Sequence, residues 1–472
     1  MCGVIGVVGV ESSNQIIFDG LTMLQHRGQD AAGIMTCTDS NIFLKKGKGL
    51  VVDVIKSSHM SFLRGCMGIG HVRYPTAGSD SQLESQPFFV NSPYGVGLAH
   101  NGNLVNTSII KKELVEKDLK HVNTSSDSEL LLNVLSAELG KGCTPHENFC
   151  KNILFRAISS VFRRCLGGYA VVGIIVGQGF FAFRDPKGIR PLTLGVKKSS
   201  RNQYIISSET VAFEWDGYRL VNDIQPGEVL FIDSCNKIHL KLCHNQAILN
   251  TCMFEYVYLA RPDSFIDGVS VYNARLEMGY RIALKITKVY RKKDIDVVMP
   301  IPDSGRQSAL ALAHGLGVKY CEGFIKNRYV GRTFIMSTQK KRTNSIKRKL
   351  NIIPQEFTNK HVLLVDDSIV RGNTSKLIIS MCRKANTRVL SLVSTSPVVK
   401  YPNIYGIDMP THKELIGSSK NISDIARWIG VDYLYYLNLC DLIKSICSVS
   451  SKIKQFETSV FDGNYITGKL VN

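Results

Sequence analysis

Cys2 is the first residue whose position suggests chemistry, because removal of an initiator methionine is usual before a small side chain. The thiol would then lie beside a free α-amino group, and these two groups have ordinary pKa values of about 8.5 and about 8. Near neutral pH the amine can accept a proton when the thiol attacks a carbonyl, so one residue supplies nucleophile and base. A lone cysteine here is more often a small buried residue that starts a strand. The residues that follow must decide between these interpretations.

Polar groups suited to an amino-acid substrate follow Cys2 along the chain. Arg73, in HVRYPTAG, has the planar guanidinium that can hold a carboxylate through two hydrogen bonds. AHNGN supplies Asn101 and Gly102, a side-chain amide and a backbone N–H, which are the two donors that an oxyanion hole needs. Asp127 stands at an expected helix start and could accept from an α-ammonium. Taken singly, Asn-Gly usually marks a turn, and Asp before a helix is usually a cap.

Together with QHRGQDAAG at residues 25–33, these motifs resemble the class II glutamine amidotransferases, a family of N-terminal-nucleophile hydrolases. The resemblance spans residues 2 to about 235 and implies that the thiol attacks the glutamine amide. Ammonia leaves first, and water then releases glutamate from the thioester. Because Cys2 follows Met1 directly, we expect no propeptide. The resemblance implies the catalytic residues Cys2, Asn101 and Gly102 and the glutamine-binding residues Arg73, Asp127, His26 and Thr76.

A second motif, VLLVDDSIVRGNTS, occupies residues 362–375. An apolar strand ends in Asp366 and Asp367, and a glycine-containing turn leads into a helix. Open α/β sheets bind ligands at the carboxyl ends of their strands, and N–H groups at a helix start suit a phosphate. Paired carboxylates can hold ribose hydroxyls directly or through Mg²⁺. A generic Asp-Asp pair is more often solvated, so the complete run carries the interpretation.

This run resembles the phosphoribosyl pyrophosphate (PRPP) signature of the type I phosphoribosyltransferases. The carboxylates would face the ribose, and residues 371–375 would hold the 5-phosphate. PIPDSGRQSAL would be the pyrophosphate loop, and residues 323–342 resemble the lid of that family. Asn373 departs from the hydroxyl residue usual there, and we expect a changed affinity rather than lost binding. The implied PRPP-binding residues are Asp303, Ser304, Gly305, Lys326, Arg328, Tyr329, Arg332, Asp366, Asp367, Ser368, Arg371, Gly372, Asn373, Thr374 and Ser375, with Ser304, Asp366 and Asp367 near Mg²⁺.

The elements that must position these residues change character midway along the chain. Short β-type runs such as CGVIGVVG and YAVVGIIVG, interrupted by helical patterns, predict mainly antiparallel sheets that close near Asp233. From about Thr251 strands and helices alternate, which predicts a parallel, doubly wound sheet. We therefore expect an α+β N-terminal-nucleophile hydrolase domain of layered antiparallel sheets and helices over residues 2–235. An α/β type I phosphoribosyltransferase domain with a parallel sheet would follow over residues 250–472, with C-terminal helices and a tail.

A class II glutaminase followed by a phosphoribosyltransferase resembles the glutamine PRPP amidotransferase family across nearly the whole chain. The resemblance implies an enzyme that makes 5-phosphoribosylamine, the first committed step of purine synthesis, with ammonia moving internally between two sites. It also implies Mg²⁺, feedback by purine nucleotides and a homotetramer. The alternative is a PRPP-binding regulatory protein with a vestigial glutaminase. Glucosamine-6-phosphate synthase would lack VLLVDDSIVRGNTS, and a purine repressor would not need Cys2.

One subgroup of this family carries an iron–sulfur cluster on four cysteines, and this sequence departs from that pattern. Cys252 occupies one ligand position, but Asn403 stands at another, and ETSVFDG lacks the final cysteines. Because such clusters need thiolates, we predict no cluster and expect Cys252 to be a packing residue. The 13 cysteines contain no CxxC pair, which argues against the usual structural zinc spacing.

Composition limits the remaining possibilities. A chain of 472 residues, 44% hydrophobic and 21% charged, predicts two or three globular domains. It has no apolar run of the about 20 residues that cross a bilayer and no basic region typical of a signal peptide, so we expect a cytoplasmic protein. The net charge of +19 fits lysine on solvated faces best, although binding of nucleic acid or of a small polyanion near Lys326 to Lys349 stays open. We predict no nucleic-acid or membrane partner.

Overall fold

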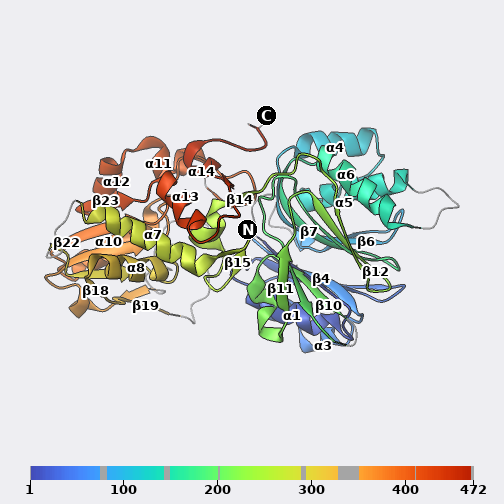
Figure 1. Cartoon of the computed structure of the whole chain (residues 1–472), viewed down its shortest axis with the longest axis horizontal. Coiled ribbons are helices and arrows are strands. Elements are labelled where there is room, and N and C mark those ends of the chain that lie inside the picture. Colours follow the sequence, from blue (N-terminus) through green and yellow to red (C-terminus); the bar gives the residue numbers. More distant parts are fainter. Residues whose placement is uncertain are drawn as a thin grey trace.

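The computed structural model describes residues 2–74, 82–142, 149–199, 202–288, 294–327, 350–409 and 411–468. In Figure 1 the antiparallel sheets and their helices lie on the right, and the parallel sheet with its helices lies on the left. The predicted order, a layered antiparallel part followed by an α/β part with a parallel sheet, is confirmed. We refer to these as the N-terminal part and the C-terminal part.

The first antiparallel sheet has seven strands in the order β11-β9-β10-β1-β4-β2-β3. They are β1 (Gly3–Val8), β2 (Ala31–Cys37), β3 (Ile42–Lys48), β4 (Met67–Arg73), β9 (Thr193–Lys197), β10 (Gln203–Ser207) and β11 (Arg219–Asp223). All six residues of β1 are buried, which explains why this central strand reads as a continuous apolar run. Helix α1 (Ser13–Met23) covers the outer face, where Ile17 and Leu21 share a core with Ile5.

The second antiparallel sheet packs face to face on the first. Its order is β13-β12-β8-β7-β6-β5, with β5 (Phe88–Val90), β6 (Val96–Leu104), β7 (Gly167–Ile175), β8 (Gly179–Arg184), β12 (Glu228–Asp233) and β13 (Ile238–Leu242). Val4 and Ile69 from the first sheet share a core with Val172 and Phe180 from the second. Helices α4 (Thr107–Glu116), α5 (Asp127–Lys141) and α6 (Lys151–Arg164) cover the outer face. The sheet runs to Leu242, past the expected end at 235, because the partly exposed edge strand β13 pairs with β12.

The C-terminal part contains a five-stranded parallel sheet in the order β18-β17-β21-β22-β23. Its strands are β17 (Val297–Pro300), β18 (Lys319–Tyr320), β21 (His361–Asp366), β22 (Val389–Ser394) and β23 (Tyr433–Tyr436). Helices α7 (Val271–Ile286), α8 (Arg306–Leu316) and α13 (Leu439–Cys447) contribute to the core on one face, and α10 (Asn373–Lys384) and α12 (Ile422–Ile429) to the core on the other. Pro300 lies opposite Val365, so the loop after β17 begins beside the end of β21.

Shorter elements complete the described chain. Three two-stranded sheets pair β14 (Asn250–Cys252) with β24 (Gln455–Glu457), β15 (Phe265–Ile266) with β16 (Val269–Ser270), and β19 (Phe324–Lys326) with β20 (Leu350–Ile352). A π-helical turn, η4 (Glu255–Leu259), lies between β14 and β15 near the start of the C-terminal part. The remaining short helices are α2 (Val51–Val54), α3 (Ser57–Met60), η1 (Gln82–Glu84), η2 (Thr210–Ala212), η3 (Glu214–Asp216), η6 (Pro354–Glu356), η7 (His412–Glu414), α11 (Ile416–Ser419) and α14 (Ser459–Asp462).

Candidate active sites

The thiol of Cys2 lies at the start of the central strand β1 and is buried. Tyr74, just after β4, holds the sulfur through its main chain: its N lies 3.5 Å and its O 3.7 Å from Cys2 Sγ. Arg27 Nε donates to the Cys2 carbonyl oxygen at 3.0 Å. The nucleophile predicted from the sequence is therefore held by main-chain contacts at the end of two paired strands.

The two predicted oxyanion donors lie on β6, next to this strand end. Asn101 is fully buried, and its Nδ2 lies 3.5 Å from Ser208 Oγ, which also accepts from Val4 N at 3.0 Å. Asn101 Oδ1 has no hydrogen-bond partner among the described residues. Gly102 has a φ of +146°, and a Cβ there would lie 2.0 Å from the Gly168 oxygen, so only glycine fits. Ser208, which the motifs did not reveal, links the amide to the strand that carries the nucleophile.

The residues predicted to hold the amino-acid end of glutamine lie on neighbouring elements. The Arg73 guanidinium contacts two carboxylates, Asp30 Oδ2 at 3.1 Å and Glu84 Oε2 at 2.6 Å. Asp127 starts α5 and accepts from Leu104 N at 3.0 Å, two residues beyond Gly102. Asp30 falls within the 25–33 motif region, whereas no local pattern singled out Glu84.

Two further predicted glutamine-binding residues fall elsewhere. His26 Nε2 lies 2.8 Å from Glu209 Oε1, and its Nδ1 lies 3.1 Å from Met23 O, so both ring nitrogens have protein partners. Thr76 lies outside the described residues. Burial alone would raise the pKa of Glu209. The neighbouring His26 and Arg27 together have the larger, opposite effect, and the pKa of Glu209 lies well below its usual range.

The acidic pair lies at the carboxyl end of β21. Asp366 Oδ1 accepts from Asp367 N at 3.0 Å, and Asp367 accepts from Ser368 Oγ at 2.6 Å and from Ser304 Oγ. Burial, and then the neighbouring Asp367 charge, raise the pKa of Asp366 well above its usual range. Burial also raises the pKa of Asp367, and the two serine hydroxyls partly offset it. Burial and the closeness of the two carboxyls therefore disfavour ionisation of both groups at once.

The predicted phosphate loop connects this pair to α10. Gly372 has a φ of +75°, and a Cβ on it would lie 2.7 Å from the Trp428 ring. Asn373 is the first residue of α10, whose N-terminal N–H groups lack a side-chain cap, and Ser375 is buried. Arg371 Nε lies 3.4 Å from Glu414 Oε1. An uncapped helix start with its positive dipole end suits an anion.

The predicted pyrophosphate loop carries its own ion pairs. Asp303 contacts Lys326 Nζ and lies 3.3 Å from Arg306 Nη1, and Arg306 Nη2 lies 2.9 Å from Glu322. Gly305 immediately precedes α8. The predicted lid residues Arg328, Tyr329 and Arg332 lie outside the described residues.

Cys252 and Asn403 have packing and turn-forming roles in the structure. Cys252 is 1% exposed in the core of the C-terminal part, and burial raises the pKa of its thiol to about 12. Asn403 Oδ1 accepts from Tyr405 N at 2.9 Å and from Ile407 N at 3.0 Å. Within the described ranges, no group of three or more His, Cys, Asp or Glu side chains could hold a metal ion. The predicted lack of an iron–sulfur cluster stays a prediction.

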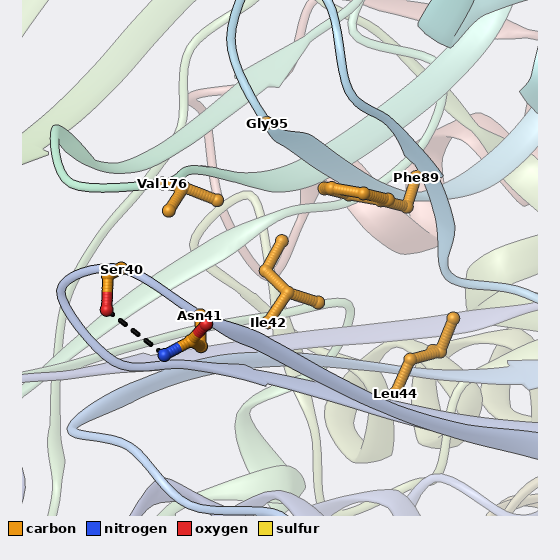
Figure 2. Close-up of a pocket in the computed structure, with 7 residues that line it drawn as sticks. All are labelled: Ser40, Asn41, Ile42, Leu44, Phe89, Gly95 and Val176. Atoms are coloured by element: carbon orange, nitrogen blue, oxygen red, sulfur yellow. Dashed lines mark hydrogen bonds between the residues drawn. The ribbon is translucent and has the colours of Figure 1, made fainter.

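A hollow of about 500 Å³ lies away from both sites. It is lined by Ser40, Asn41, Ile42, Leu44, Phe89, Gly95 and Val176 (Figure 2). None of these is a predicted site residue. In the parts of the chain that the structure describes, no helix has the length and apolar character needed to span a membrane.

Comparison with known proteins agrees with this geometry. Residues 71–214 match a family model described as a glutamine amidotransferase domain. An amidophosphoribosyltransferase of Pseudomonas aeruginosa is 52% identical over 471 residues, which cover 99% of this chain and 93% of that protein. The chain belongs to the amidophosphoribosyltransferase family. The predicted class of enzyme, a glutamine-dependent phosphoribosyltransferase, is confirmed.

Other relatives support the assignment over the whole chain. The Escherichia coli amidophosphoribosyltransferase is 50% identical over 470 residues, covering 99% of this chain and 93% of that protein. A solved structure of glutamine PRPP amidotransferase from B. subtilis, complexed with ADP and GMP, superimposes with a TM-score of 0.86 at 35% identity. That match covers 98% of this chain and 97% of the other. The two-part architecture is therefore that of the family.

Proposed function

We propose that this chain hydrolyses glutamine at Cys2 and passes the ammonia internally to C1 of PRPP. The products would be 5-phosphoribosylamine, glutamate and pyrophosphate, which is the first committed step of purine synthesis. The observation that carries the proposal is the presence of two complementary sites in one chain. A held thiol lies beside Asn101, and a buried acidic pair lies at a strand end beside an uncapped helix start.

The first reaction is amide hydrolysis at the N-terminal part. The Cys2 thiol attacks the glutamine amide carbon as its proton passes to the residue's own α-amine. Asn101 Nδ2 and the Gly102 N–H stabilise the oxyanion, and the proton passes to the departing ammonia. Arg73 and Asp127 hold the carboxylate and the ammonium of the substrate, with Thr76 and His26 as further contacts. Water then hydrolyses the thioester and releases glutamate.

The second reaction is substitution at C1 of PRPP in the C-terminal part. Ammonia attacks the anomeric carbon from the face opposite the departing pyrophosphate. Asp366 and Asp367 hold the ribose hydroxyls, and residues 371–375 hold the 5-phosphate. Asp303 to Gly305, Lys326 and the lid residues Arg328, Tyr329 and Arg332 contact the pyrophosphate. Catalysis here is mainly positioning and charge stabilisation of an oxocarbenium-like state.

We further propose Mg²⁺ as the metal that acts at this second site. The residues present fit it, because Asp366 and Asp367 are hard oxygen ligands that form no ion pair with any described residue, and Ser304 Oγ lies against Asp367. Bound there, Mg²⁺ would offset negative charge on the diphosphate. We propose no iron–sulfur cluster, since Asn403 already uses its side-chain oxygen to accept two main-chain hydrogen bonds.

Direct contacts between the two parts support internal transfer of ammonia. Asn103 Nδ2 donates to Ile404 O at 3.0 Å, and the Tyr74 hydroxyl lies 3.4 Å from Asp408 Oδ2. A Cβ on Gly406 would lie 2.7 Å from the carbonyl carbon of Gly102. The C-terminal segment around residue 406 thus lies against the oxyanion strand, where ammonia is released.

Regulation, assembly and compartment are proposed on the same basis. The solved relative complexed with ADP and GMP supports purine nucleotides as feedback inhibitors. A homotetramer is the expected assembly, from family resemblance alone. PRPP carries several negative charges and does not cross a bilayer unaided, so we propose that the enzyme works in the cytoplasm.

Replacement of the nucleophile tests the proposal. Cys2→Ala should abolish glutamate release and glutamine-dependent pyrophosphate release, because no thioester can form. Pyrophosphate release with free ammonia should persist, because Asp366 and Asp367 are unchanged. Both activities are followed on the same preparation, with Cys235→Ala, an exposed thiol far from β1 in sequence, as the control. A Cys2→Ala protein that still releases glutamate would contradict the assigned nucleophile.

A further inference from the structure

A buried ionic network connects the nucleophile to the C-terminal part. Arg27, Arg190 and Glu209 come from the N-terminal part, and Glu255 starts the π-helical turn η4. All four side chains are fully buried. Arg27 contacts Glu209 and grips Glu255 with both ends of its guanidinium, Nη2 to Oε1 at 2.8 Å and Nη1 to Oε2 at 3.1 Å. Arg190 Nη1 lies 3.3 Å from Glu255 Oε1, so two positive and two negative charges compensate each other.

The same guanidinium also holds the residue that carries the thiol. Arg27 Nε donates to the Cys2 carbonyl oxygen at 3.0 Å, which leaves every nitrogen of the fork engaged. The sulfur itself contacts the Tyr74 main chain, with N at 3.5 Å and O at 3.7 Å. Because a displacement of about 1 Å can cost about a hundredfold in rate, the position of the Arg27 fork bears directly on the thiol.

The far end of η4 is anchored by a buried arginine of α7. Arg275, on α7, donates through Nε to Tyr256 O at 2.8 Å and through Nη2 to Ala260 O at 2.8 Å. It is 3% exposed, and burial lowers its pKa, which the charge of Asp367 partly offsets. One arginine therefore clamps both sides of a π-helical turn, an irregularity that occurs often at functional sites.

We propose that Arg27 is a positioning residue for the Cys2 nucleophile, held in place by Glu255, so that the geometry of the glutaminase site depends on η4 of the C-terminal part. The chain of contacts runs from the Cys2 carbonyl through Arg27, Glu255 and η4 to Arg275 on α7. This inference rests on the proposed role of Cys2 in glutamine hydrolysis.

The variant Glu255→Gln tests the positioning role of Arg27. Glutamine keeps the shape of the side chain but removes the negative charge that holds the Arg27 guanidinium. The matched control is Asp267→Asn. Asp267 is also a buried carboxylate of the C-terminal part that holds a fully buried arginine of the N-terminal part, Arg184, at 2.6 and 3.0 Å. Among the described residues its side chain bonds neither Cys2 nor Arg27, and asparagine accommodates its φ of +49°.

We expect Glu255→Gln to lower kcat for glutamate release by at least about tenfold while the KM for glutamine changes little. Pyrophosphate release with free ammonia should stay within about twofold of wild type, which shows that the C-terminal part is folded. Asp267→Asn should leave both activities within about twofold. A general loss of docking between the two parts would instead affect the two variants alike, and that result would overturn the inference.

Two further outcomes keep the test decisive. If Glu255→Gln does not fold, Glu255→Asp retains the charge but shortens the reach to Arg27, and the same loss of kcat is expected. Normal glutamate release by a folded Glu255 variant would refute the positioning role while leaving the proposed function intact. Glutamate release by the Cys2→Ala variant would refute the proposed function itself.

Discussion

Individual side chains in both sites are held by partners distant in sequence. Ser304 and Asp367 are 63 residues apart, yet the serine hydroxyl bonds the carboxylate. Asp366 and Asp367 share one end of β21, where burial keeps their pKa values high. Such a pair favours a bound cation or donor hydroxyls, because either lowers the cost of two adjacent negative charges.

Neutralising the acidic pair should separate the two activities. Asp366→Asn with Asp367→Asn removes the groups proposed to hold the ribose, so pyrophosphate release should fall by at least about a hundredfold with either glutamine or ammonia. A slow release of glutamate should remain, because Cys2 and its partners are untouched. Steady-state assays of both products make the measurement, with Asp296→Asn, a partly exposed carboxylate beside the opposite end of the sheet, as the control. Normal PRPP turnover by the double variant would refute the proposed roles.

Secondary-structure elements position these side chains, and the backbone of β6 fixes the proposed oxyanion donors. Gly102 has a positive φ and packs against the Gly168 carbonyl of the neighbouring strand. Gly102→Ala should therefore displace the oxyanion donors and lower glutamine-dependent activity by at least about a hundredfold. Ammonia-dependent pyrophosphate release should persist, because the change lies in the N-terminal part. Gly140→Ala, in α5, where a Cβ meets only Pro93 at 3.9 Å, is the control. Unimpaired glutamate release by Gly102→Ala would rule out the proposed oxyanion strand.

Element types were predictable from the sequence where local patterns are strong. The run before Asp366 reads as a strand, and Gly372 reads as a turn before a helix, and the structure has both. Fold class followed from the change in pattern near residue 250. Ser208, Glu84 and Glu255 could not be identified in this way, because their partners lie on strands and loops that only the folded chain brings near. The edge strand β13 was also missed, since IHLKL is short and partly exposed.

At the scale of the whole molecule, buried charged residues meet where the two parts join. Asp223 ends β11 and faces Asp267, which is paired with Arg184. Burial, and then the Asp267 charge, raise the pKa of Asp223 to about 7, and its Oδ1 has no hydrogen-bond partner among the described residues. Protonated Asp223 therefore favours the folded state. Its contribution to the free energy of unfolding is complete below pH about 4, the pKa of an aspartate in the unfolded chain.

Stability should accordingly fall as the pH rises from about 4 to about 7. Asp223→Asn keeps the shape but cannot ionise, so it should raise the thermal midpoint at pH 8 and change it little at pH 5. Thermal unfolding of wild type and variant at both pH values gives the measurement, with the exposed Asp39→Asn as the control. An equal effect at both pH values would show that ionisation of Asp223 is not responsible.

The proposed enzyme couples two reactions in one chain. The most direct measurement follows glutamate and pyrophosphate together when the purified protein receives glutamine, Mg²⁺ and PRPP. We predict equal release of the two products, with glutamate release falling sharply when PRPP is omitted. Glutamate release indifferent to PRPP, without pyrophosphate, would contradict the account, because the thiol site would then serve another acceptor.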